Sequence, residues 1–417
     1  MLLHVYNKAR LSGEITVSSS KNAILPILAA SLLSTEKVEI KKVPYINDVI
    51  IITELIRNLG VNTQNNGNNI ILGADTVSDS PDFDLVRQIR ASFLIMGPLL
   101  ARHGRVKIAF PGGCAIGNRP IDLHLKGFVA LGAKIRLSYG NVIATSQRLK
   151  GNHIYLDFPS VGATENIMMA AALADGTSYI ENAALEPEIV DLANFINSMG
   201  GKITGAGSNV IKVEGVKELK GTSYTPIADR IEVGTYMVAA AATAGDITIK
   251  NVIPEHVKAI SAKLIESGVE IIENQDKIRV KRNQAIKPLY IKTLPYPGFP
   301  TDMQAQFMAY LSCAEGSSII TESVFENRFM HVAELTRMGA NINTEGRTAI
   351  IKGVKELSGA NVKATDLRAG AALLIGALTA RGKSTITNSE HIDRGYENIV
   401  EKLTHLGAKI SREQKKD

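Results

Sequence analysis

One short phrase occurs six times in this chain of 417 residues, and the interval between its copies is nearly constant. The copies read LGVNT, LGAKI, MGGKI, SGVEI, MGANI and LGAKI. Successive glycines are 72, 68, 68, 71 and 68 residues apart, and they are Gly60, Gly132, Gly200, Gly268, Gly339 and Gly407. A fixed period of this kind is typical of repeated structural units. The sequence therefore predicts six modules of about seventy residues each.

Each copy of the phrase closes an amphipathic stretch, such as VIIITELIRNLG or EIVDLANFINSMG, in which apolar residues recur at helical spacing. A glycine in this place is typical of the C′ position of a helix. Short β-patterned segments such as NNIILGA follow the glycine. The other half of each module is a more apolar helix, a glycine turn and a strand, as in TENIMMAAALADG followed by TSYIENA. The pattern predicts a βαβαββ module.

A chain of this length favours two domains, and six modules then give three to each domain. The helices rich in Ala and Gly should pack inside each domain, where amphipathic helices and sheets cover them. The first 20 residues precede the modules, and we expect them to pair with the C-terminal half. We therefore expect one domain of residues 1–20 and 229–417 and another of residues 21–228.

The composition excludes several classes of protein. The chain is 45% hydrophobic and 21% charged, as in soluble globular proteins, and it has no apolar run of the ~20 residues that span a bilayer. It lacks an apolar signal segment, so we expect a cytoplasmic protein. Two cysteines, Cys114 and Cys313, are too few for a disulfide framework or a cysteine zinc site. The net charge of +6 is scattered, which argues against nucleic acid and favours a small anionic ligand.

Unusual polar residues occur at two positions of the modules. The first is the start of the apolar helix, with Lys21, Asn22, Arg90, 164–166, Asp229, Arg230, Asp302, Asp366 and Arg368. The second is the connector before the amphipathic helix, with Cys114, Arg119, Arg328 and Arg394. Helix N-termini carry partial positive charge, so arginines beside them favour a site for phosphate or carboxylate. Asp229 or Thr164, taken alone, is more simply an N-cap.

The connector PGGCAIGNRPID, residues 111–122, places Cys114 among glycines and close to Arg119. Glycines let a backbone approach a ligand closely, so this segment is more typical of a binding loop than of a packed core. Cys313 lies in the apolar pattern QFMAYLSCAEG and is interpreted as a packing residue. For His124 and His391, a structural and a functional role are equally open.

Motifs along nearly the whole chain resemble those of one family, the UDP-N-acetylglucosamine enolpyruvyl transferases (1-carboxyvinyltransferases). They include SKNAILPILAASLL, PGGCAIGNRPIDLHLKGF, FPSVGATENIMMAAAL, DRIEVGTYM, PYPGFPTDMQAQFMA, FENRFMHVAEL, ATDLRAGAALL and HIDRGYE. The resemblance implies a two-domain inside-out α/β barrel with three repeats in each domain. It also implies transfer of the enolpyruvyl group of phosphoenolpyruvate to the 3′-hydroxyl of UDP-N-acetylglucosamine, the step that opens peptidoglycan synthesis. Ser19 and Glu390 depart from the usual pattern, but they flank the positions that matter.

The resemblance also implies a role for individual residues. Cys114 matches the catalytic cysteine, the proton donor that fosfomycin alkylates, and Asp302 matches the candidate base at the sugar hydroxyl. The phosphoenolpyruvate positions are Lys21, Asn22, Arg119, Arg328, Arg368 and Arg394. The UDP-sugar positions are Arg90, Arg119, Pro120, Ile121, Asp122, Leu123, Phe158, Pro159, Ser160, Val161, Asp302 and Val324. No metal and no cofactor are implied.

Three alternatives are weighed against this interpretation. The sister enzyme acting on shikimate 3-phosphate, 3-phosphoshikimate 1-carboxyvinyltransferase, shares the fold but lacks the cysteine motif. A non-catalytic paralogue would be expected to lose Cys114 or Asp302, and both are present. A repeat protein acting on RNA ends would need basic blocks and aromatic stacking surfaces that the sequence lacks.

The same residues lead to an expectation about charge. Five arginines and Lys21, gathered without an anion, would repel one another. We therefore expect the two domains to be open in the absence of the UDP-sugar.

Overall fold

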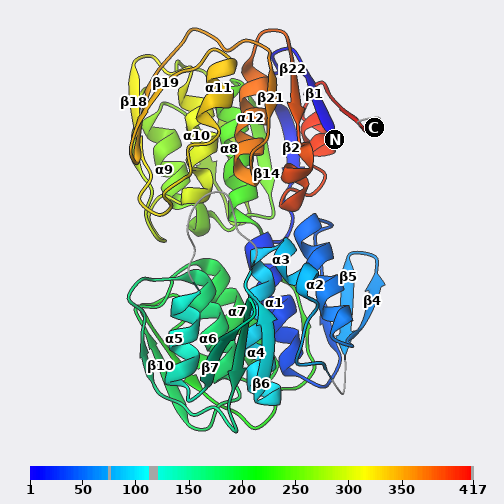
Figure 1. The fold of residues 1–417 in the computed structure, drawn as a ribbon. Helices are drawn as coiled ribbons and strands as arrows, with labels where there is room; N and C mark the ends of the chain where they lie inside the picture. Colours follow the sequence, from blue (N-terminus) through cyan, green and yellow to red (C-terminus); the bar gives the residue numbers. More distant parts are fainter. Residues whose placement is uncertain (74–76, 112–120, 415–417) are drawn as a thin grey trace. The chain divides into compact units, whose positions relative to one another are not determined.

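The computed structural model describes residues 1–73, 77–111 and 121–414, and these form two compact units (Figure 1). The N-terminal unit comprises the described residues between 19 and 227, and the C-terminal unit comprises 1–18 and 228–414. The domains expected from the sequence had their boundaries after residues 20 and 228. We propose that the two units are those domains, and each is described by itself.

The modules of the N-terminal unit follow one another along the chain. The first contains α1 (Lys21–Ala30), η1 (Ser31–Leu33), β3 (Val38–Ile40), α2 (Asn47–Asn58), β4 (Asn62–Asn66) and β5 (Asn69–Gly73). The second contains α3 (Phe83–Gln88), η2 (Arg90–Ile95), α4 (Met96–His103), β6 (Arg105–Ala109), α5 (Asp122–Ala130), β7 (Lys134–Ser138) and β8 (Asn141–Thr145). The third contains β9 (His153–Tyr155), α6 (Val161–Ala171), β10 (Thr177–Glu181), α7 (Pro187–Ser198), β11 (Lys202–Thr204) and β12 (Val210–Glu214).

The C-terminal unit is built in the same way, with β1 (Leu2–Tyr6) and β2 (Ser12–Thr16) from the start of the chain. Its first module contains α8 (Arg230–Ala242), β14 (Asp246–Lys250), η3 (Pro254–Val257), α9 (Lys258–Glu266), β15 (Glu270–Glu273) and β16 (Lys277–Lys281). The next contains β17 (Tyr290–Lys292), η4 (Thr301–Met303), α10 (Gln304–Leu311), β18 (Ser317–Thr321), α11 (Val332–Arg337), β19 (Asn341–Glu345) and β20 (Thr348–Lys352). The last contains β21 (Asn361–Lys363), α12 (Leu367–Thr379), β22 (Lys383–Thr387), η5 (Ser389–Arg394), α13 (Ile399–His405) and β23 (Ile410–Glu413).

The sheets confirm the βαβαββ pattern. In the third module β9 runs parallel to β10, β10 pairs antiparallel with β12, and β12 pairs antiparallel with β11. Ile180 of β10 lies opposite Ile154 of β9 and Ile211 of β12, so one face of the sheet is apolar and packs on the core. The sheet of β17, β18, β20 and β19 has the same order and directions.

Three sheets are completed by strands from distant parts of the sequence. β1 lies between β22 and β23, and β2 runs parallel to β14, so the expected pairing of the first residues with the C-terminal half is confirmed. β13 (Ser223–Tyr224) runs parallel to β3 and returns the chain to the first module. The sheet of β6, β8 and β7 has three strands within the described residues.

Each unit has its own core around the apolar helices (Figure 1). Every residue of α8, α10 and α12 is buried, because Ala and Gly in these helices let neighbouring helices approach closely. The six periodic glycines follow α2, α5, α7, α9, α11 and α13 with φ between 91° and 100°. Side chains rarely adopt this backbone conformation, so the repeated phrase is a helix terminator, as predicted. Within the part of the chain that the structure covers, no helix combines the length and the apolarity needed to cross a membrane.

Candidate active site

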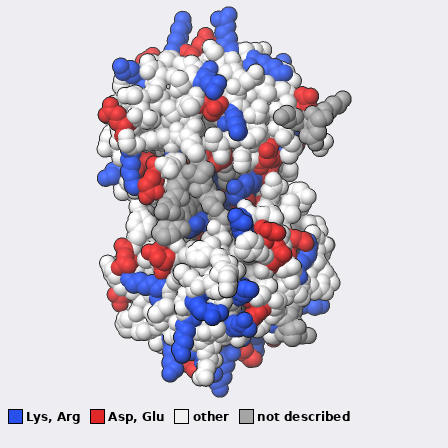
Figure 2. All heavy atoms as spheres, viewed as in Figure 1, with Lys and Arg blue, Asp and Glu red and all other residues white. Residues whose placement is uncertain are grey.

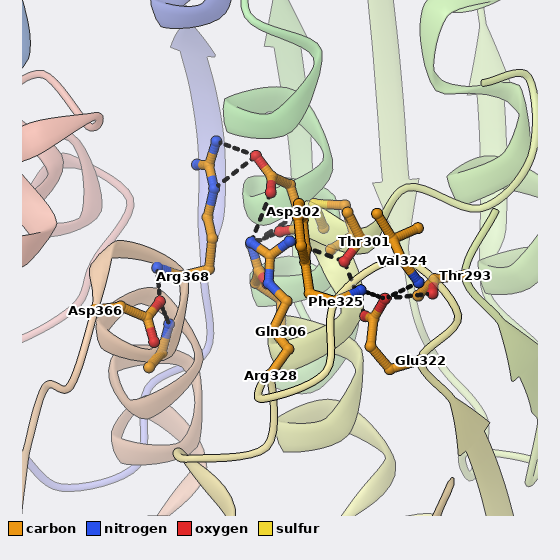
Figure 3. Close-up of polar contacts among 12 residues, drawn as sticks. Thr293, Thr301, Asp302, Gln306, Glu322, Val324, Phe325, Arg328, Asp366 and Arg368 are labelled. Carbon is orange, nitrogen blue, oxygen red and sulfur yellow. Dashed lines mark hydrogen bonds and ion pairs between the residues drawn. The ribbon is translucent and has the colours of Figure 1, made fainter. Parts of the chain in front are cut away.

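Asp302 of the C-terminal unit lies between two arginines (Figure 3). Its Oδ1 accepts a hydrogen bond from Nη2 of Arg328 at 2.6 Å. Its Oδ2 accepts from Nη2 and Nε of Arg368 at 2.9 and 3.2 Å. Asp302 lies in η4 before α10, Arg368 is the second residue of α12, and Arg328 precedes α11. Equivalent ends of successive modules therefore bring the three side chains together, as the sequence pattern predicted.

The exposure of these side chains is unequal. The Asp302 side chain is 26% exposed, whereas those of Arg328 and Arg368 are 6% and 5% exposed. Burial favours the neutral acid, but the charges of Arg368 and Arg328 prevail and hold the pKa of Asp302 well below its ordinary value. The site therefore presents an ionised carboxylate in front of two buried guanidinium groups.

Arg328 has a second contact that does not involve Asp302. Its Nη1 donates to the Thr301 hydroxyl at 2.8 Å, and that hydroxyl donates to Oε2 of Glu322 at 2.8 Å (Figure 3). Oε1 of Glu322 accepts from the backbone N–H of Val324 at 2.8 Å. The buried Glu322 thus links Arg328 to the segment that carries Val324, one of the residues expected at the UDP-sugar.

Arg368 likewise has a separate contact. Its Nη1 donates to the Tyr396 hydroxyl at 3.0 Å. That hydroxyl lies 2.9 Å from Oγ1 of Thr235, which itself donates to the carbonyl of Ile231 at 2.7 Å. Thr235 must therefore accept from Tyr396, and the Tyr396 oxygen is left to accept from Arg368. Arg394, another expected ligand of phosphoenolpyruvate, ends η5 two residues before Tyr396.

In the N-terminal unit, Lys21 also lies against a carboxylate. It is the first residue of α1, and its Nζ lies 2.7 Å from Oδ2 of Asp48 in the first turn of α2. The Lys21 side chain is 13% exposed and that of Asp48 is 4% exposed. Asn22 is the next residue of α1 and is half-buried.

A buried amide in α6 connects three parts of this unit. Oδ1 of Asn166 in α6 accepts from the backbone N–H of Gly97 at 2.7 Å, and its Nδ2 donates to the carbonyl of Phe93 at 2.9 Å. The same Nδ2 lies 3.1 Å from Nδ1 of His124. Burial, helped by the nearby charge of Arg90, lowers the pKa of His124 to about 3. His124 is therefore a neutral, buried ring of α5 in contact with α6.

The other described positions that are expected at the UDP-sugar lie at helix starts. Ile121 precedes α5 and is buried, Asp122 and Leu123 open α5, and Arg90 opens η2. Phe158, Pro159, Ser160 and Val161 lead into α6, and Ser160 is its N-cap, accepting from the backbone N–H of Ala163 at 3.3 Å. Phe158 is 47% exposed.

The loop motif lies largely outside the described residues. Cys114, Arg119 and Pro120 belong to the segment 112–120, outside the described residues. Cys313 follows α10 and packs against the core of the C-terminal unit. Burial raises the pKa of the Cys313 thiol, so the reactive thiolate form is disfavoured there.

The N-cap interpretation holds for one of its two residues. Asp229 caps α8 and accepts from the backbone N–H groups of Ile231 and Glu232 at 2.8 and 2.9 Å. Thr164 is not an N-cap, because Ser160 occupies that position. Thr164 lies one turn later, where its hydroxyl accepts from the backbone N–H of Ala184 at 3.1 Å.

Four residues that support the expected ligand residues within one unit or the other were not identified from the sequence, namely Asp48, Thr301, Glu322 and Tyr396. Asp48 and Thr301 stand at helix starts, where the argument from polar residues could have found them. Tyr396 lies in the motif HIDRGYE, which carried the resemblance without assigning it a role. Glu322 follows strand β18 and gives no local signal. In the part of the chain with assigned structure, no cluster of three or more His, Cys, Asp or Glu side chains could hold a metal ion.

Two units of three βαβαββ modules, with cationic side chains at the ends of the apolar helices, define the class of enolpyruvyl transferases. A sequence profile of the family EPSP synthase (3-phosphoshikimate 1-carboxyvinyltransferase) matches residues 5–403. The enolpyruvyl transferase NikO from Streptomyces tendae superposes with a TM-score of 0.88 at 26% identity, over 98% of each chain. EPSP synthase from Acinetobacter baumannii, at 17% identity, shares the fold with a TM-score of 0.76 over 99% of this chain and 100% of its own.

Sequence relatives narrow the class further. UDP-N-acetylglucosamine 1-carboxyvinyltransferase 2 of Carboxydothermus hydrogenoformans is 57% identical over 411 residues, covering 98% of both chains. UDP-N-acetylglucosamine 1-carboxyvinyltransferase 1 of Caldanaerobacter subterraneus subsp. tengcongensis is 57% identical over 402 residues, covering 96% of this chain and 97% of its own. The chain belongs to the EPSP synthase family and, within it, to the UDP-N-acetylglucosamine 1-carboxyvinyltransferases, and it is an enzyme of this class.

Proposed function

We propose that the chain transfers the enolpyruvyl group of phosphoenolpyruvate to the 3′-hydroxyl of UDP-N-acetylglucosamine and releases phosphate. The observation that carries the proposal is the pair of buried guanidinium groups of Arg328 and Arg368, which face the ionised carboxylate of Asp302. Paired guanidinium groups recognise a carboxylate or phosphate through parallel hydrogen bonds. The relatives at 57% identity bear the name of this activity.

The reaction is an addition followed by an elimination. In the addition, the sugar oxygen forms a bond to C2 of phosphoenolpyruvate while its proton passes to a base, and C3 gains a proton from an acid. In the elimination, the bond from C2 to the phosphate oxygen breaks and C3 loses a proton. We assign the acid to Cys114 and the base to Asp302, and cations stabilise the charge on phosphate and carboxylate.

The binding roles follow the same proposal. Phosphoenolpyruvate is held by Lys21, Asn22, Arg119, Arg328, Arg368 and Arg394. The UDP-sugar is held by Arg90, Arg119, Pro120, Ile121, Asp122, Leu123, Phe158, Pro159, Ser160, Val161, Asp302 and Val324. A product of this kind would be used for peptidoglycan, and therefore for cell-wall formation, cell shape and division. The cytoplasmic location expected from the sequence stays a prediction.

The alternatives receive less support. The family profile bears the name of the shikimate enzyme, but the EPSP synthase of Acinetobacter baumannii is only 17% identical. A non-catalytic paralogue would not need to keep the ionised Asp302 between two buried arginines. On the face drawn in Figure 2, Lys and Arg are interspersed with Asp and Glu, and no continuous basic surface suited to RNA is visible there.

The decisive test is release of phosphate that requires both UDP-N-acetylglucosamine and phosphoenolpyruvate, with shikimate 3-phosphate as the competing acceptor. Phosphate release from phosphoenolpyruvate with shikimate 3-phosphate but not with UDP-N-acetylglucosamine would overturn the assignment of the acceptor. A second test is alkylation by fosfomycin, an epoxide phosphonate. Peptide mass spectrometry should find the adduct on Cys114 and not on Cys313, whose buried thiol is less ionised. An adduct on Cys313 would remove Cys114 from its role.

A further inference from the structure

Asp302 covers the charged groups that the substrate is proposed to bind. Among the described residues, only Arg328 and Arg368 donate hydrogen bonds to its carboxylate. The two arginine side chains are 6% and 5% exposed, while the Asp302 side chain is 26% exposed. The carboxylate is therefore the accessible member of the group, and the arginines lie behind it.

Each arginine also has an anchor that is independent of Asp302. Arg328 donates to Thr301, which is fixed by Glu322, and Arg368 donates to Tyr396, which is fixed by Thr235. Loss of the Asp302 contacts would thus leave one hydrogen bond holding each guanidinium group in place. The arrangement keeps the arginines fixed while the carboxylate in front of them can be replaced.

Two buried cations without a counter-ion would be strongly unfavourable, so some anion must always face them. We infer that Asp302 is an exchangeable counter-ion, and that the carboxylate of phosphoenolpyruvate displaces it from Arg328 and Arg368 and frees it for the sugar hydroxyl. This inference rests on the proposed function. The exchange couples the two substrates, because Asp302 becomes available as a base for the sugar hydroxyl only when phosphoenolpyruvate has bound.

The N-terminal unit contains a second pair of this kind. Lys21, proposed to hold the phosphate, lies 2.7 Å from the buried carboxylate of Asp48. In each unit, therefore, a cation assigned to phosphoenolpyruvate has an internal carboxylate as its partner.

A permanent structural ion pair predicts the opposite response to mutation. If Asp302 only orients the arginines, its neutralisation should weaken anion binding. If Asp302 competes with the ligand, its neutralisation should strengthen binding, because the guanidinium groups no longer have to be released. The sign of the change therefore separates the two interpretations.

The probe is phospholactate, which carries the carboxylate and phosphate of phosphoenolpyruvate but has no double bond to react. We expect Asp302→Asn to bind phospholactate at least tenfold more tightly than the wild type in calorimetric titrations without UDP-sugar. The control is Asp246→Asn, which removes the same charge from an exposed ion pair with Arg279 in the same unit. It should bind phospholactate as the wild type does.

Unchanged or weaker binding by Asp302→Asn would overturn the inference. If that variant does not fold, a wild-type structure with phospholactate decides, since the bond of 2.9 Å between Arg368 Nη2 and Asp302 Oδ2 should be broken. An intact bond beside bound phospholactate would also overturn it. Failure of the proposed function is distinguishable, because it appears as absent phosphate release by the wild type, whereas these measurements need no turnover.

Discussion

Replacement of Tyr396 by Phe tests whether the Tyr396 hydroxyl positions the guanidinium group of Arg368. The change removes a hydroxyl that accepts from Nη1 of Arg368 at 3.0 Å and leaves the ring in place. A hydrogen bond to a charged group contributes roughly 1.5–3 kcal/mol, so kcat/KM for phosphoenolpyruvate should fall by about 10- to 100-fold. The loss should appear mainly in KM for phosphoenolpyruvate, because Arg368 is proposed to bind that substrate.

The stability cost of the same change should be small. Thr235 keeps its bond to the carbonyl of Ile231 at 2.7 Å, and Gln306 keeps its bond to the carbonyl of Asp302 at 2.9 Å. Gln306 is the third partner of the Tyr396 hydroxyl, to which its Nε2 donates at 3.3 Å, and Arg368 keeps its bonds to Asp302. Because all three former partners stay bonded elsewhere, the free energy of unfolding should fall by only ~1 kcal/mol. Steady-state phosphate release and urea unfolding measure the two effects separately. Equal losses of kcat/KM for both substrates, or an unchanged value for phosphoenolpyruvate, would refute the positioning role of Tyr396.

Three further predictions concern the N-terminal unit. The pKa of His124 is about 3 in the folded chain and 6.5 in the unfolded chain, so between these values only the unfolded chain binds the proton. Protonation of His124 should therefore lower the free energy of unfolding by ~3 kcal/mol at pH 4.5 relative to pH 7. In urea unfolding, the variant His124→Gln should lose this pH dependence. Asn166→Ala leaves the buried N–H of Gly97 without its acceptor, and unfolding should become easier by roughly 3 kcal/mol. In calorimetric titrations, Asp48→Asn should bind inorganic phosphate at Lys21 about threefold more tightly than the wild type. Weaker binding would show that the pair of Lys21 and Asp48 is purely structural.

The parts of the fold that were predicted from the sequence depend on local signals. Gly60 and its five counterparts end helices by adopting positive φ, which is a property of the residue itself and of its position after a helix. The apolar helices are recognisable because burial on all sides removes their polar face, as in α8 and α12. Both features can be identified without knowing any long-range contact.

The parts that were missed depend on long-range contacts. β13 has only two residues, and nothing in Ser223 or Tyr224 indicates pairing with Glu39 and Ile40 far earlier in the chain. Arg368 and Tyr396 were both visible in motifs, but their contact requires α12 to lie beside η5. Thr164 was expected at the N-cap of α6 but lies one turn inside the helix. The local pattern alone did not show that α6 begins at Val161 and is capped by Ser160.

The internal carboxylates change the electrostatic argument made from the sequence. Five arginines and Lys21 were expected to repel one another without an anion. Within the units, however, Asp302 accepts from Arg328 and Arg368, and Asp48 lies against Lys21. In the exchange proposed above, phosphoenolpyruvate replaces one anion by another, and the free energy of its binding is the difference between two ion-pairing states. A ligand whose anionic group pairs with Arg328 and Arg368 no better than Asp302 does gains little from this exchange, so the proposed site should favour a ligand that accepts hydrogen bonds from both guanidinium groups over simple anions.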